Sequence, residues 1–107
     1  MLNYVAQGKY PAMIEGVLNY YPVWWEGGNE DLLGISNFGL EHFPQLTLWL
    51  PADKEIASIR QLNRKGEWKQ ADYILAAHPY QGQRVTLQTT SVPGPLSYET
   101  FLFTYET

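Results

Sequence analysis

The sequence predicts an all-β protein, and the architecture that fits best is a small antiparallel β-sandwich. Several short segments alternate apolar and polar residues, turn signals recur about every 8 to 15 residues, and no long segment has convincing helical spacing. Two alternatives share much of this pattern. One is a small β-barrel, and the other is an α+β fold with a short helix at about residues 53–63.

The length of 107 residues predicts one domain, residues 1–107, built around a single hydrophobic core. Hydrophobic residues make up 45 % of the chain and charged residues 17 %, which is typical of a folded globular protein. The aromatic content is unusual at 15 %, with eight tyrosines and four tryptophans. Because each such ring covers a large area, we expect more rings than one small interior can hold.

The charge balance and the missing residue types exclude several classes of partner. Seven basic against eleven acidic residues give a net charge of −4, which disfavours nucleic acid and anionic membranes. The chain has no cysteine, so disulfides and thiolate metal sites are excluded. The N-terminus does not read as a signal peptide, and no apolar stretch approaches the roughly 18 residues of a transmembrane helix. We expect a soluble protein, and its location stays unassigned.

The densest aromatic segment covers residues 19–28 and ends in two glycines. A strand sends neighbouring side chains to opposite faces, so Tyr20 and Tyr21 cannot both enter one core, and the same holds for Trp24 and Trp25. Pro22 has no N–H to donate, which indicates an edge strand, a bend or a rim. This segment is therefore the first candidate for an exposed aromatic surface.

The other elements of the first half follow from alternation and from glycine and proline. Residues 1–11 read as a short strand or arm, 12–21 as a strand, and 32–40 as an irregular strand or a short helical turn. Residues 26–31 predict an acidic loop without the ligand order of a calcium site. Residues 45–51 form the clearest strand, with three leucines facing the core and Trp49 on the opposite face.

Residues 53–77 allow two interpretations. Asp53 could cap a helix whose apolar residues recur every three positions, whereas residues 63–66 fit a type I turn closed by a glycine bulge. The second interpretation is favoured and gives a hairpin of residues 56–62 and 67–77. In its register the inward residues are Ala71, Tyr73, Leu75 and Ala77, and the outward ones are Trp68, Gln70 and Asp72.

The C-terminal part predicts a strand at residues 84–90, a type II turn at Pro93 and Gly94, and a last strand from Leu96 to Tyr105. The last strand is apolar on both faces at its centre. It is therefore expected to be an inner strand or one that a partner covers.

The sequence carries no recognisable catalytic constellation. His42 and His78 each lie near a proline and lack a motif that would pair them with a nucleophile, so both are expected to be loop histidines. A glycine-rich phosphate loop is also missing. We therefore predict a protein that is not an enzyme, with no catalytic residue, metal or cofactor.

The leading functional hypothesis is a structural or assembly protein, of the kind found as a virion component, that binds a protein partner or itself. Protein interfaces are enriched in tryptophan, tyrosine and arginine, which fits the aromatic excess. A basic hairpin tip would complement the acidic loop at 26–31 in another copy. The predicted interaction surface comprises Tyr21, Trp24, Trp25, Trp49, Arg60, Arg64, Lys65 and Trp68.

The alternative hypothesis is a carbohydrate-binding module. Its surface rings would stack on sugar faces, and polar contacts would come from Asn19, Glu26 and Asn29. Neither hypothesis requires nucleic acid or a membrane as a partner.

Overall fold

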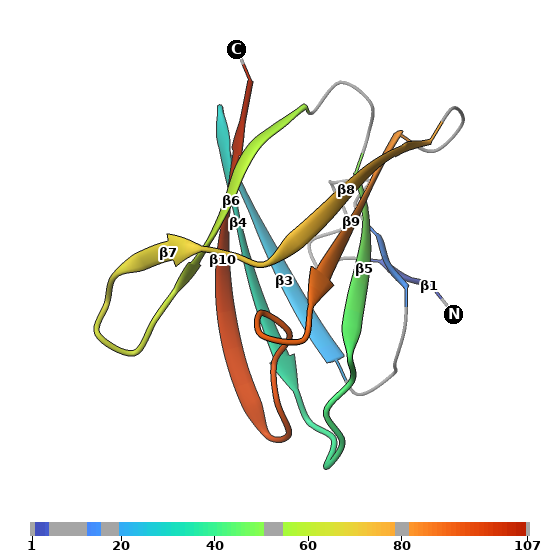
Figure 1. Cartoon of the computed structure of the whole chain (residues 1–107), viewed down its shortest axis with the longest axis vertical. Helices are drawn as coiled ribbons and strands as arrows, with labels where there is room; N and C mark the ends of the chain where they lie inside the picture. The colour runs from blue at the N-terminus through green and yellow to red at the C-terminus, as the bar shows by residue number, and fades with distance from the viewer. Residues whose placement is uncertain (1, 5–12, 16–19, 51–54, 79–81, 107) are drawn as a thin grey trace.

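A computed structural model describes residues 2–4, 13–15, 20–50, 55–78 and 82–106, and these form two antiparallel sheets that pack face to face (Figure 1). The predicted small β-sandwich is confirmed. The described residues contain no helix, and Ile56–Leu62 is a strand. The alternative of a helix at about 53–63 is therefore wrong, because the hairpin turn that follows this strand holds it in a sheet.

Each sheet has five strands. The first sheet has the order β1-β2-β5-β9-β8, with β1 Leu2–Tyr4, β2 Met13–Glu15, β5 Gln45–Leu50, β9 Gly82–Gln88 and β8 Tyr73–His78. The second sheet has the order β3-β4-β10-β6-β7, with β3 Tyr20–Gly27, β4 Glu30–Asn37, β10 Ser97–Tyr105, β6 Ile56–Leu62 and β7 Trp68–Gln70. Two predictions are confirmed by this order. Pro22 lies in an edge strand, and β10 is the central strand of its sheet.

The core lies between the two sheets. Leu46, Leu48 and Leu50 are buried as predicted, since alternate residues of β5 face the second sheet. From the second sheet, Trp24 packs against Phe103 with the ring centroids 5.2 Å apart. The other fully buried large side chains include Leu33, Ile35, Ile59, Leu87 and Phe101.

The predicted acidic loop at 26–31 is a tight turn of a β-hairpin rather than a loop. Strand β3 runs to Gly27 and β4 begins at Glu30, so only two residues connect them, and Gly28 takes a φ of +64°. Asp31 is buried, where it accepts hydrogen bonds from the Tyr105 hydroxyl at 2.7 Å and the Gly27 N–H at 3.2 Å. One carboxylate of the predicted acidic loop, that of Asp31, therefore belongs to the interior.

The predicted strand at 67–77 is broken into two strands that belong to different sheets. Strand β7 ends at Gln70 and β8 begins at Tyr73 (Figure 1). At the crossing Ala71 is buried, and the Asp72 N–H donates to the Ser91 hydroxyl at 2.8 Å. These contacts bend the chain from one sheet to the other.

The predicted facing of the residues after this break agrees with the register, but their burial does not. Leu75 lies opposite the buried Val85, so the two share the inner face. Leu75 is nevertheless 40 % exposed, because β8 is the edge strand of the first sheet. Tyr73 is half-buried on the same face, and the side chain of Ala77 lies outside the described residues. Gln70 and Asp72 are exposed, as expected.

Tyr20 gives the fold a dependence on alkaline pH. Its ring lies edge-on to Phe43 at 6.0 Å, and burial raises the pKa of its hydroxyl above the ordinary 10.0. Its contribution to stability is therefore fully present below pH 10.0 and is lost as the pH rises through the higher pKa of the folded state. Between pH 8 and about pH 11.5, the free energy of unfolding is expected to fall less in Tyr20→Phe than in the wild type. Urea denaturation at the two pH values measures both falls. Equal losses in the two proteins would contradict this assignment.

Candidate interaction surface

The outer face of the second sheet carries large apolar side chains that the core does not use. Tyr20 and Trp24 face inward from β3, so Tyr21, Val23 and Trp25 face outward. Tyr21 is 54 % exposed and Trp25 is 46 % exposed. The prediction that each aromatic pair is divided between the two faces of the strand is therefore confirmed.

Cross-strand pairing continues this face across the sheet. Trp25 lies opposite Leu32 of β4, Leu32 lies opposite Leu102 of β10, and Leu102 lies opposite Arg60 of β6. Residues that lie directly opposite in an antiparallel pair share one face. Leu32, Leu102 and Arg60 are all partly exposed, so this row forms a continuous outer surface.

Because Gly34 has no side chain, the rings of Tyr98 and Trp25 can pack over its backbone on this surface. It lies between Val23 and Thr100 in the register, one row from Trp25. A Cβ at Gly34 would overlap the Tyr98 hydroxyl and would lie 3.2 Å from the Trp25 ring. The missing side chain thus lets both rings cover the backbone, as aromatic side chains do over glycines in designed sheets. Tyr98 is still 54 % exposed, so its ring remains available to a partner.

We call this surface the outer aromatic face. Phe38, just after β4, extends it at one end, since its ring is 6.3 Å from the ring of Tyr21. The face consists of Tyr21, Val23, Trp25, Leu32, Gly34, Tyr98, Leu102, Arg60, Leu62 and Trp68, with Phe38 at its margin.

Two of the predicted surface residues do not belong to it. Trp24 is only 1 % exposed, so its assignment to the interaction surface is wrong; the alternation of β3 sends it to the core together with Tyr20. Trp49 lies on the first sheet, opposite Arg84, whose guanidinium carbon is 6.0 Å from the Trp49 ring centroid. That distance is within the range of a cation–π contact, and the Trp49 ring is partly covered.

The predicted basic hairpin is divided between two places. Arg60 and Trp68 lie on the outer aromatic face, whereas Arg64 and Lys65 are exposed in the turn. The turn has the predicted chemistry. Gly66 takes a φ of +82°, and the Asn63 side-chain oxygen accepts from the N–H groups of Lys65 and Glu67, each at 2.9 Å.

Arg60 is the one cation in the row of Trp25, Leu32 and Leu102. Its Nε atom is buried and has no hydrogen-bond partner in the described part of the chain. A buried donor without an acceptor is costly in free energy and is rare in folded proteins.

Besides Phe38 at its margin, the sequence prediction missed six members of this face: Val23, Leu62, Gly34, Leu32, Leu102 and Tyr98. The signal that could have found the last two was present, since the apolar residues on both sides of the last strand pointed to a covered or central strand. Gly34 and Leu32 had no such signal, because residues 32–40 could not be assigned a register.

The two histidines and the groups of possible metal ligands were singled out by the sequence as candidates for chemistry. His42 lies in a loop as predicted, with its Nε2 atom 3.4 Å from the Val92 carbonyl oxygen. The same prediction is wrong for His78, which is the last residue of β8 and pairs with Gly82; its side chain lies outside the described residues. No group of three histidine, aspartate or glutamate side chains in the described ranges is placed to hold a metal ion. The same ranges contain no helix long and apolar enough to cross a bilayer.

No protein-family model, curated protein or solved structure matches the chain. Its function is therefore inferred from the surfaces themselves.

Proposed function

We propose that the protein is a non-enzymatic assembly protein that self-associates through the outer aromatic face. The observation that carries this proposal is the group of exposed tyrosine and tryptophan rings on one side of the second sheet. A sheet face that contacts only solvent does not need such a large apolar surface. Aromatic residues and arginine are the residue types that dominate interface energetics.

The charges favour a second copy as the partner. The whole chain carries a net charge of −4, so two copies repel each other on average. The outer side of the strands that form the face has one described carboxylate, Glu30, which lies next to Thr104, and one guanidinium, Arg60. Two copies that meet through this face thus bring together surfaces without net charge, where repulsion is smallest.

The size of the face sets the expected strength. Four strands about 4.8 Å apart, each with about eight residues that rise 3.3 Å, cover roughly 500 Å². Two copies would then bury roughly 1,000 Å² in total, which is the lower limit for a specific interface. We therefore expect a reversible, concentration-dependent dimer instead of a permanent one.

The test is the mass in solution by light scattering, between about 10 µM and 1 mM protein. The 12.3 kDa chain is expected to increase in average mass with concentration. The double variant Tyr21→Ser/Trp25→Ser is expected to stay monomeric. Ile74→Ser is a matched control, since Ile74 is 58 % exposed on the other sheet, and it should behave like the wild type.

A second variant tests whether self-association depends on the shape of the outer aromatic face as well as on its apolar area. Gly34→Ala removes no apolar atom, but its methyl group would displace the Tyr98 ring and crowd the ring of Trp25. We expect it to weaken self-association while the fold is kept. A wild type that stays at 12.3 kDa at every concentration would contradict the proposal.

The carbohydrate-binding alternative depends on the same exposed rings, Tyr21, Trp25 and Tyr98. Of its expected polar contacts, Asn19 and the side chain of Glu26 lie outside the described residues, and Asn29 is exposed in the turn after β3. Titration with a panel of oligosaccharides, followed by tryptophan fluorescence, would detect sugar stacking. The narrower prediction of a virion-type component stays a prediction.

A further inference from the structure

Strand β10 has a neighbour on both sides along only part of its length. Strand β4 pairs with it from Ser97 to Thr104, whereas the pairing of β6 with it begins at Phe101. Among the strands that the structure describes, none pairs with residues 97–100 on the side of β6, and this stretch is called the open edge of β10. Open strand edges are sites where an extended chain can pair.

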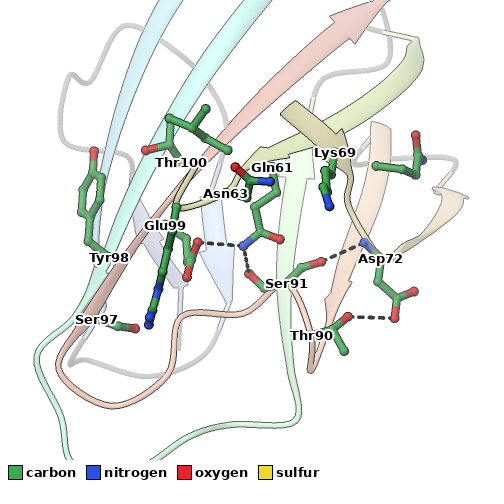
Figure 2. Close-up of a pocket in the computed structure, with 13 residues that line it drawn as sticks. Gln61, Asn63, Lys69, Asp72, Thr90, Ser91, Ser97, Tyr98, Glu99 and Thr100 are labelled. Carbon is green, nitrogen blue, oxygen red and sulfur yellow. Dashed lines mark hydrogen bonds between the residues drawn. The ribbon is translucent and has the colours of Figure 1, made fainter. Parts of the chain in front are cut away.

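A hollow of about 810 Å³ lies along this open edge. One wall is the start of β10, and the other is the β6–β7 hairpin with Asn63, Arg64 and Lys69. Figure 2 shows Gln61, Glu99 and Ser91 together between the two walls, with Tyr98 at one side. The hollow thus separates two elements that are paired farther along the sheet.

The backbone of Tyr98 points into this hollow. The Ala71 N–H donates to the Ile59 carbonyl at 2.9 Å, so the main-chain groups of Ile59 are directed toward β7 and those of Arg60 toward β10. Arg60 lies opposite Leu102, and main-chain directions alternate along a strand. Tyr98, four residues before Leu102, therefore directs its N–H and C=O to the same side, beyond the end of β6.

The side chains of the hollow give it two different sides. On the inner side, Gln61 Nε2 donates to Glu99 Oε2 at 2.9 Å and to the Ser91 carbonyl at 3.2 Å, which holds the carboxylate in place (Figure 2). Within the described part of the chain, no cation pairs with Glu99. On the outer side lie the Tyr98 ring and Leu62.

We propose that this hollow binds an extended peptide segment of a partner protein, which adds to the open edge of β10 as a short strand. Strand addition uses main-chain hydrogen bonds for affinity and alternate side chains for specificity. In this register the peptide residue opposite Tyr98 is apolar and covers its ring. The next residue is basic and reaches the half-buried Glu99, whereas the exposed Arg64 and Lys69 remain in solvent on the opposite wall.

The test uses two blocked hexapeptides, Val-Thr-Val-Lys-Val-Thr and Val-Thr-Val-Glu-Val-Thr, titrated into the ¹⁵N-labelled protein and followed by NMR. The lysine peptide is expected to shift the Tyr98 and Thr100 amide signals and to bind about fivefold or more tightly than the glutamate peptide. Glu99→Gln keeps an acceptor for Gln61 and is expected to remove this preference. Shifts confined to other parts of the protein, or equal binding of both peptides, would overturn the proposal.

Two further arms of the experiment distinguish the peptide site from a sugar site and from the self-association face. An oligosaccharide that shifts the same amides when neither peptide does would assign the hollow to sugars and overturn the proposal. Because Tyr98 belongs to both surfaces, the comparison is made at the lowest protein concentration, where self-association is smallest. There Trp25→Ser is expected to leave peptide binding unchanged, and across the whole concentration range Glu99→Gln is expected to leave the solution mass unchanged. The peptide site and the self-association face can therefore fail separately.

Discussion

Replacing Trp24 by alanine is expected to lower the free energy of unfolding by about 3 to 5 kcal/mol, the cost of removing a large buried ring. Trp24 is 1 % exposed and packs 5.2 Å from the Phe103 ring, between the two sheets. A cavity of this size in a chain of 107 residues removes much of its stability. Urea denaturation followed by circular dichroism measures the difference.

The neighbouring Trp25 is the matched control for this variant. Its ring lies on the outer aromatic face and is 46 % exposed, so Trp25→Ala is expected to cost about 1 kcal/mol or less. Trp24→Phe keeps a ring and should cost less than Trp24→Ala, which gives a measurable variant if the alanine protein does not fold. Similar losses for Trp24→Ala and Trp25→Ala would contradict the assigned faces of β3.

Replacing Asn37 by alanine is expected to cost about 2 to 4 kcal/mol, because it removes three hydrogen bonds inside the protein. The buried Asn37 amide donates to the Glu41 carbonyl at 2.9 Å and to the Pro93 carbonyl at 3.3 Å, and its oxygen accepts from the Gly39 N–H at 2.9 Å. Its loss leaves the carbonyl of the buried Pro93 with one other hydrogen bond among the described residues, from the Tyr20 hydroxyl at 3.4 Å. Thermal and urea unfolding both measure this cost.

Asn63 provides the control for this prediction, because it makes the same number of side-chain hydrogen bonds at the surface. Its oxygen accepts from Lys65 and Glu67, and its amide donates to the Glu67 carboxylate at 3.3 Å. Water replaces such bonds at an exposed turn, so Asn63→Ala is expected to cost about 1 kcal/mol. If Asn63→Ala costs as much unfolding free energy as Asn37→Ala, the claim that burial makes the Asn37 hydrogen bonds more stabilising is contradicted.

Local patterns in the sequence predicted most of the strands. The alternation of leucines in 45–50 and the glycine turn at 63–66 each depend on neighbouring residues, and both were recovered. Residues 67–77 were different. Their strand character was right, but the sheet to which each half belongs depends on distant contacts of Ala71 and Asp72, which no local pattern records.

The candidate surface was predicted in part for the same reason. Alternation required one ring of each aromatic pair to leave the core, but only the register shows that Tyr21 and Trp25 are the outward members. Tyr98 joins them because β10 lies beside β4, a pairing between residues about sixty positions apart in the chain. The open edge of β10 is likewise a property of where β6 ends.

The most direct test of the central claim is hydroxyl-radical labelling of the aromatic side chains at low and high protein concentration. If the outer aromatic face is the self-association surface, labelling of Trp25 and Tyr98 is expected to fall with concentration, whereas labelling of Trp49 on the other sheet stays constant. Unchanged labelling of Trp25 and Tyr98, or protection confined to Trp49, would contradict the account.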